Sequence, residues 1–115
     1  MHELSIAMSI VELAEEESLR RGGRRVEAVH LRLGGLAGIV RSALLASYEM
    51  ACESTPLEGS RLVIEDVPIV AQCATCQART PVRSIYEMCC DVCGTPAVDI
   101  VEGRELLVSA LEMAS

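Results

Sequence analysis

The sequence contains no tryptophan, no phenylalanine and no lysine. Only 2% of its 115 residues are aromatic, all of them tyrosine, so its core must be built from aliphatic side chains. Few aromatic rings also argue against single-strand nucleic-acid binding, which relies on stacking. The ten basic residues are all arginine, and seventeen acidic residues outnumber them, for a net charge of −7. This charge argues against sequence-independent nucleic-acid binding, which needs a basic face.

The sequence also lacks long hydrophobic runs. None approaches the roughly 20 residues of a membrane-spanning helix, and the opening Met1-His2-Glu3 lacks the basic start of a secretory signal. We therefore expect a cytoplasmic protein with no membrane partner. Cysteines in that compartment stay reduced, and they bind metal more often than they form disulfides.

The hydrophobic pattern predicts two helices. Apolar residues recur at helical spacing from Leu4 to Ala14, and Gly22-Gly23 supplies a stop. A second helix is expected from about Arg41 to Glu53, with Ser42 as its cap.

Strands are expected on either side of a cysteine-rich segment. Those before it are residues 26–33 and 61–70, with Pro68 marking an edge or a late break. Those after it are residues 98–101 and 105–113, joined by a tight turn at Glu102-Gly103.

This order predicts an α+β fold in which a small sheet with two helices is interrupted by an insert. We assign residues 1–71 and 97–115 to the α+β domain and residues 72–96 to the insert. About 25 residues bury too little surface to fold by hydrophobic burial alone, so the insert needs a cross-link such as a bound metal ion or a disulfide.

Two CxxC pairs are the candidates for that cross-link: Cys73 with Cys76, and Cys90 with Cys93. The two-residue gap lets both thiolates of one turn reach the same ion, and two such turns complete a tetrahedron. Four thiolates favour Zn(II) in a closed structural site. An iron–sulfur site and disulfides are the alternatives, and compartment argues against disulfides.

The two remaining cysteines differ in context. Cys89 could compete with Cys90 as a ligand, but the usual spacing favours Cys90. Cys52 falls in a helical apolar pattern and is interpreted as a small core residue.

The first three residues, Met1-His2-Glu3, offer a second kind of metal site. A terminal amine, backbone amides and a nearby imidazole can form fused chelate rings, and such nitrogen ligands suit square-planar Ni(II) or Cu(II). Most chain termini are solvated and frayed, so these three residues alone do not establish a metal site. The other histidine, His30, is expected on an exposed or partner-facing strand surface.

Taken together, the chain resembles the HypA family of nickel metallochaperones over essentially its whole length. The resemblance rests on the opening Met1–Ser5, the stretch Leu33–Gly38, the stretch Glu53–Glu65, the two CxxC pairs and the final strand. The chain departs from the family at Asp91, where members often have proline, and in the added thiol of Cys89.

The resemblance implies a nickel-binding domain interrupted by a zinc domain. It implies Ni(II) binding through the nitrogens of Met1, His2 and Glu3, and structural Zn(II) on the four CxxC cysteines. Implied partners are the maturation GTPase HypB and the [NiFe]-hydrogenase large subunit.

The expected function is therefore binding and delivery of nickel, and not catalysis, because no nucleophile–base pair stands out. A zinc-ribbon accessory or nucleic-acid-binding module is the alternative, and a redox or iron–sulfur protein is a third. The sequence leaves the oligomeric state open, including a homodimer that exchanges its last strand.

Overall fold

The computed structural model describes residues 2–84, 88–96 and 98–115. The chain divides into two compact units. The first contains Met1–Leu31, Gly38–Glu65 and Leu107–Ser115, and the second contains Arg32–Ala37 and Asp66–Leu106. Among the described residues, no helix has the length and apolarity needed to cross a membrane.

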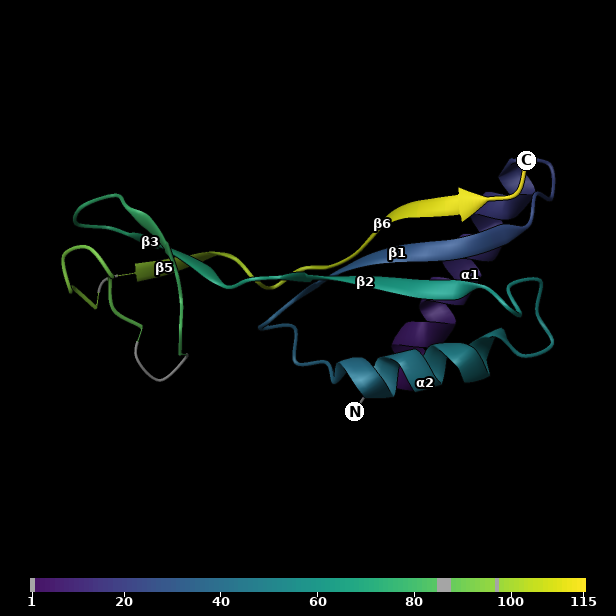
Figure 1. Ribbon diagram of the computed structural model, residues 1–115, viewed down its shortest axis with the longest axis horizontal. Helices are drawn as coiled ribbons and strands as arrows, with labels where there is room; N and C mark the ends of the chain where they lie inside the picture. The colour runs from purple at the N-terminus through teal and green to yellow at the C-terminus, as the bar shows by residue number, and fades with distance from the viewer. Residues whose placement is uncertain (1, 85–87, 97) are drawn as a thin grey trace. The chain divides into compact units, whose positions relative to one another are not determined.

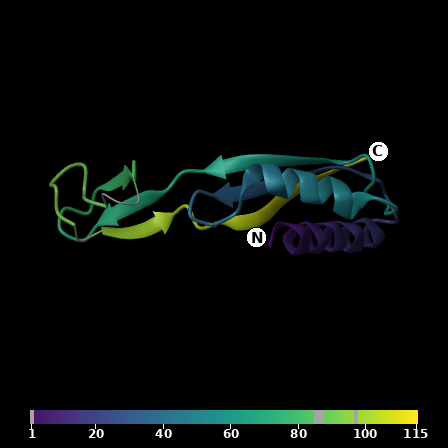
Figure 2. The ribbon, with the colours of Figure 1, turned by 90° about the horizontal axis from the view of Figure 1, so that it is seen from below.

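The first unit is built around helices α1 (Glu3–Arg20) and α2 (Arg41–Cys52) and a three-stranded sheet. The sheet has the order β2 (Arg61–Val67), β1 (Val26–Gly34) and β6 (Leu106–Met113). Figure 1 shows these strands side by side with α1 behind them, and Figure 2 shows the same layers edge-on. The predicted α+β class, with two helices on a small sheet, is confirmed.

Aliphatic side chains fill the core of this unit. Leu31, Leu44 and Leu57 are at most 1% exposed. Helix α1 buries Ala7 and Ala14, about two turns apart, and packs against α2. The buried residues of the described core are mostly small or branched, and they include one aromatic side chain, Tyr48, which is 3% exposed on α2.

The expected cap of α2 is wrong. Helix α2 begins at Arg41, which makes Val40 its N-cap and places Ser42 inside the first turn. The carboxylate of Glu3 instead accepts a hydrogen bond from the Val40 backbone N–H at 3.2 Å. An acidic group from another helix therefore satisfies the N–H of the N-cap residue and places a negative charge near the start of α2, which the helix dipole favours.

The second unit contains a separate antiparallel sheet in the order β4 (Arg79–Pro81), β3 (Val70–Cys73) and β5 (Val98–Glu102). The strand expected over 61–70 ends at Val67, so Pro68 marks a break. The strands expected at 98–101 and 105–113 are both present, but they lie in different sheets. Strand β4 was not predicted, because three residues are too few to show a period.

Within the second unit, the backbone at Gly34 packs closely against the turn at Gly103. A Cβ atom on Gly34 would lie 2.2 Å from the Gly103 carbonyl oxygen, so only glycine fits there. The Leu36 N–H donates to the Gly103 carbonyl at 2.7 Å, and the Gly34 N–H donates to the Glu105 carbonyl at 2.7 Å. Gly103 itself has φ +116°, which other residues rarely adopt.

Candidate metal-binding sites

The structure brings together the thiols of Cys73, Cys76, Cys90 and Cys93. Their four Sγ atoms all lie within 4.8 Å of one another. The Sγ atoms of Cys73 and Cys93 are 3.5 Å apart, as are those of Cys76 and Cys90. Thiolates bound at about 2.3 Å to one tetrahedral ion stand about 3.8 Å apart, so this donor set suits a single Zn(II).

The two CxxC turns repeat the same backbone hydrogen bonds. In the first, the N–H groups of Thr75 and Cys76 point to the Cys73 sulfur at 3.3 and 3.4 Å. In the second, the N–H groups of Val92 and Cys93 point to the Cys90 sulfur at 3.3 and 3.4 Å. Each turn therefore presents N–H dipoles to its first sulfur, which favours the thiolate.

A residue in the left-handed backbone conformation ends each CxxC turn. Gly94 has φ +78°, and its N–H donates to the Cys90 carbonyl at 2.9 Å. Gln77 occupies the matching place in the first turn with φ +64°, and its N–H donates to the Cys73 carbonyl at 3.0 Å. Glycine adopts this conformation freely, whereas glutamine is rare in it, so the sequence carries no signal for the turn at Gln77.

The electrostatics of the four thiols follow from these contacts. The Cys76 N–H lowers the pKa of the Cys73 thiol to about 6, and the Cys93 N–H likewise lowers the pKa of Cys90. For Cys93 the Thr95 N–H favours the thiolate, but burial and the neighbouring thiols raise its pKa overall. Four sulfurs so close together cannot all ionise alone, and a bound divalent cation relieves that repulsion.

The other two cysteines lie outside this cluster. Cys89 is exposed, whereas Cys90 is 4% exposed and contributes its sulfur. Cys52 is 3% exposed on α2, which confirms the interpretation of a core thiol.

The N-terminal tripeptide is described only in part, because Met1 lies outside the described residues. His2 immediately precedes α1 and is exposed. Its carbonyl accepts hydrogen bonds from the Ile6 N–H at 2.9 Å and the Ser5 hydroxyl at 3.0 Å. The first turn of α1 thus fixes the His2 backbone while its imidazole stays accessible to solvent.

Glu3 is the first residue of α1, and it is only 7% exposed. Its carboxylate is engaged by the Val40 N–H. The sequence showed no sign of this contact, because a hydrogen bond between two helices leaves no local pattern.

His30 lies on β1. Its Nε2 atom is 2.5 Å from a carboxylate oxygen of Glu112 on β6, and its side chain is 35% exposed. The expected strand is confirmed, but the side chain is half-buried, and the ring has an intramolecular partner that the sequence did not indicate.

Comparison with known proteins shows which family the chain belongs to. The family model described as "Hydrogenase/urease nickel incorporation, metallochaperone, hypA" matches residues 1–113. A "Hydrogenase maturation factor HypA" from Roseiflexus sp. (strain RS-1) is 47% identical over 112 residues, covering 97% of this chain and 91% of that protein. A protein of the same description from Chloroflexus aurantiacus is 46% identical over 112 residues, covering 97% and 98%.

Solved structures show the same fold. The "Solution structure of HypA protein" superimposes with a TM-score of 0.75 at 24% identity, covering 99% of this chain and 97% of that chain. The nickel metallochaperone HypA from Helicobacter pylori gives a TM-score of 0.67 at 24% identity, covering 98% and 97%. From the full-length match, the relatives and the shared fold, this chain belongs to the HypA family of hydrogenase/urease nickel-incorporation metallochaperones.

Proposed function

We propose that the protein binds Ni(II) at its N-terminus and delivers it during [NiFe]-hydrogenase maturation, with Zn(II) as a structural ion in the second unit. The observation that carries this proposal is the accessible His2 imidazole on an ordered helix start, in a chain of the nickel-incorporation family. On this proposal, residues 1–71 and 97–115 serve nickel and residues 72–96 serve zinc.

The proposed nickel ligands are nitrogens: the Met1 amine, the His2 imidazole, and backbone amides of His2 and Glu3. Such strong-field donors suit square-planar Ni(II). The first N–H groups of a helix have no intrahelical acceptor, so deprotonating them for ligation breaks no helical hydrogen bond. The buried Glu3 carboxylate serves α2 and leaves coordination to the backbone.

Release of the ion is as important as binding. A site at the end of a chain is anchored on one side only, so a partner can reach the ion from the other. Because its ligands must lose protons, nickel binding weakens as the pH falls. We propose the GTPase HypB and the hydrogenase large subunit as partners in this exchange, which takes place in the cytoplasm.

The nickel site is tested by calorimetric titration of tag-free protein with Ni(II). We expect that His2→Ala, or an extension before Met1, abolishes the specific binding event. His30→Ala is the matched control, because it removes the only other histidine and leaves the N-terminus intact. Equal nickel affinity in the wild-type and His2→Ala proteins would contradict the site.

The zinc assignment is tested by elemental analysis of purified variants. Cys76→Ser should lose stoichiometric Zn(II), because three thiolates and a hydroxyl bind it far less tightly than four thiolates. Cys89→Ser is the matched control, as it replaces an exposed thiol outside the cluster. Iron and a visible absorption band in the wild-type protein would instead favour the iron–sulfur alternative.

A further inference from the structure

The turn that joins α1 to β1 holds four of the ten arginines of the chain, at positions 20, 21, 24 and 25. We call residues 20–25 the arginine turn. It contains no acidic residue, so all seventeen carboxylates lie elsewhere in the sequence. In a chain of net charge −7, this turn is a local concentration of positive charge.

The backbone of the arginine turn is fixed. Gly22 and Gly23 have φ +80° and +79°, with open space where side chains would stand. The Gly23 N–H donates to the Ser18 carbonyl at 2.9 Å, and the Ser18 hydroxyl donates to the Arg24 carbonyl. The arginines are therefore carried by an ordered helix end.

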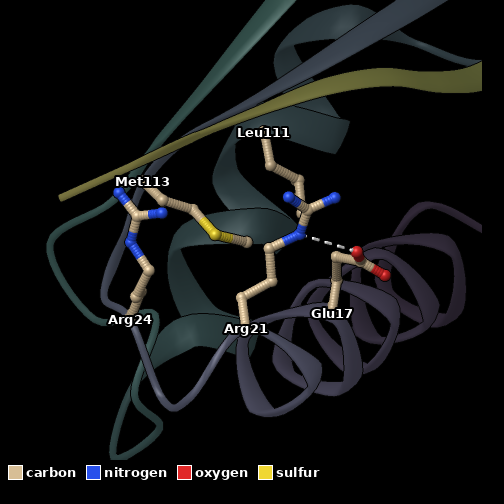
Figure 3. Close-up of a pocket in the computed structure, with 5 residues that line it drawn as sticks. All are labelled: Glu17, Arg21, Arg24, Leu111 and Met113. Atoms are coloured by element: carbon tan, nitrogen blue, oxygen red, sulfur yellow. Dashed lines mark hydrogen bonds and ion pairs between the residues drawn. The ribbon is translucent and has the colours of Figure 1, made fainter. Parts of the chain in front are cut away.

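A hollow of about 400 Å³ lies beside this turn within the first unit. Its lining combines charged and apolar groups, as Figure 3 shows: Glu17, Arg21, Arg24, Leu111 and Met113. The two arginine side chains rise from the turn toward β6, and the Met113 side chain extends between them. Two cationic groups thus flank an apolar floor.

Each of the two guanidinium groups is held in place by a hydrogen bond from its own Nε atom. Arg24 donates from Nε to the Ala114 carbonyl at 2.9 Å, and Arg21 donates from Nε to Glu17 Oε1 at 3.1 Å. Within the described part of the chain, the structure gives no partner to the Nη atoms of either side chain. Those paired donors are oriented in advance, which lowers the entropy lost on binding a ligand.

We propose that this hollow docks an acidic segment of a partner protein, with carboxylates on either side of an apolar side chain. Arginine forks match carboxylates, and the Leu111 and Met113 surface offers contact for an aliphatic group. A single phosphate would need the two guanidinium groups to converge, whereas here a thioether stands between them. This contact involves none of the proposed metal ligands. Because the rest of the protein is acidic and repels anionic surfaces, the arginine turn determines where an acidic partner can bind.

Glu17 sets the strength of this contact. Its carboxylate already pairs with Arg21 and lies 3.5 Å from Arg20, so an incoming carboxylate competes with it. Both arginine pairs are exposed and screened by salt. We therefore expect weak binding that strengthens at low ionic strength and when Glu17 is replaced by glutamine.

The probe is a fluorescein-labelled peptide of Glu-Leu-Glu repeats, titrated at two salt concentrations and followed by anisotropy. Arg21→Gln/Arg24→Gln should weaken binding about tenfold. Arg79→Gln/Arg83→Gln, which removes two arginines of the second unit, is the matched control and should leave affinity unchanged. Met113→Ala should weaken binding of the Glu-Leu-Glu peptide and leave the binding of an all-glutamate peptide unchanged.

Three results would overturn the proposal: equal binding by the pocket and control variants, equal binding of a Gln-Leu-Gln peptide, or arginine-dependent binding of inorganic phosphate as tight as that of the peptide. The last would assign a small-anion site instead. Circular dichroism verifies that each variant is folded. Arg21→Gln alone keeps the test decisive if loss of the Arg24 tie to Ala114 disturbs the fold.

Discussion

Glu3 occupies an unusual place for a carboxylate, buried at the start of one helix and bonded to the start of another. Its side chain joins the proposed nickel-binding tripeptide to the start of α2. A negative group at a helix N-terminus is favourable both as an acceptor and through the helix dipole. We therefore expect this side chain to stabilise the packing of α1 against α2.

Replacing Glu3 tests that role. Glu3→Ala should reduce the folding equilibrium constant about fivefold, the effect of losing a helix cap. The urea midpoint measures it, with Glu12→Ala, an exposed carboxylate on the same helix, as control. Identical midpoints for both variants would show that the contact with Val40 contributes nothing.

Glu112 gives the sheet a pH-dependent contact. The hydrogen bond with His30, with added attraction from Arg61, holds the pKa of this carboxyl below its ordinary value. Its stabilising contribution is complete above the unfolded pKa of about 4.3, and it is lost as the pH falls through the lower folded pKa.

We therefore expect wild-type and Glu112→Gln proteins to differ in urea midpoint near pH 6 and to converge at acid pH. Unfolding curves recorded from pH 6 to pH 3 measure the difference. A constant difference across the range would mean that the ionised carboxylate is not responsible.

At the scale of elements, the CxxC turns show how backbone conformation prepares a metal site. Each turn is closed by a residue with positive φ, Gln77 in one and Gly94 in the other. A side chain in that conformation costs about 1 kcal/mol, which the first turn already bears at Gln77. The second turn avoids that cost through glycine.

Gly94→Ala should add that cost to the second turn and speed loss of zinc to a chelator. Nothing lies within 4 Å of the added Cβ, so the effect comes from φ and not from a clash. Val92→Ala, which trims a 68% exposed side chain of the same turn and keeps its N–H, is the control. Zinc release measured with a chromogenic chelator should be faster for Gly94→Ala alone.

The elements also show what the sequence could predict. Both helices and the longer strands follow from hydrophobic periodicity, and the CxxC spacing indicated which cysteines lie together. Ser42 looked like a cap because serine often is one, but a carboxylate distant in sequence serves that place. Long-range contacts such as Glu3 with Val40 and His30 with Glu112 leave no periodic signal, so local reasoning could not find them.

At the scale of the whole molecule, the two units are stabilised by different means. The first has an aliphatic core that includes Leu31, Leu44 and Leu57. Among the described residues of the second unit, few apolar side chains are buried, and they include Cys73 and Cys90 themselves. The first unit therefore depends on hydrophobic burial, and we expect the second to depend on an ion bound by its four clustered cysteines.

Chelation should separate these two contributions. Removing the metal at neutral pH should unfold the second unit and leave the helices α1 and α2 in place, because the core they share contains no metal ligand. Far-UV circular dichroism should retain its helical signal, while amide exchange accelerates at β3 and β5. Parallel loss of the helical signal would show that the units fold as one.

The strand order β2-β1-β6 has a further consequence for this chain. Because the last strand returns to β1, the excursion from Asp66 to Leu106 is a closed loop whose two ends are held by one sheet. The entropy lost on closing a loop grows with the logarithm of its free length. A single ion held by the four cysteines would pin four positions along this loop and shorten the free chain, and it would thereby lower the entropic cost of forming the sheet that closes the loop.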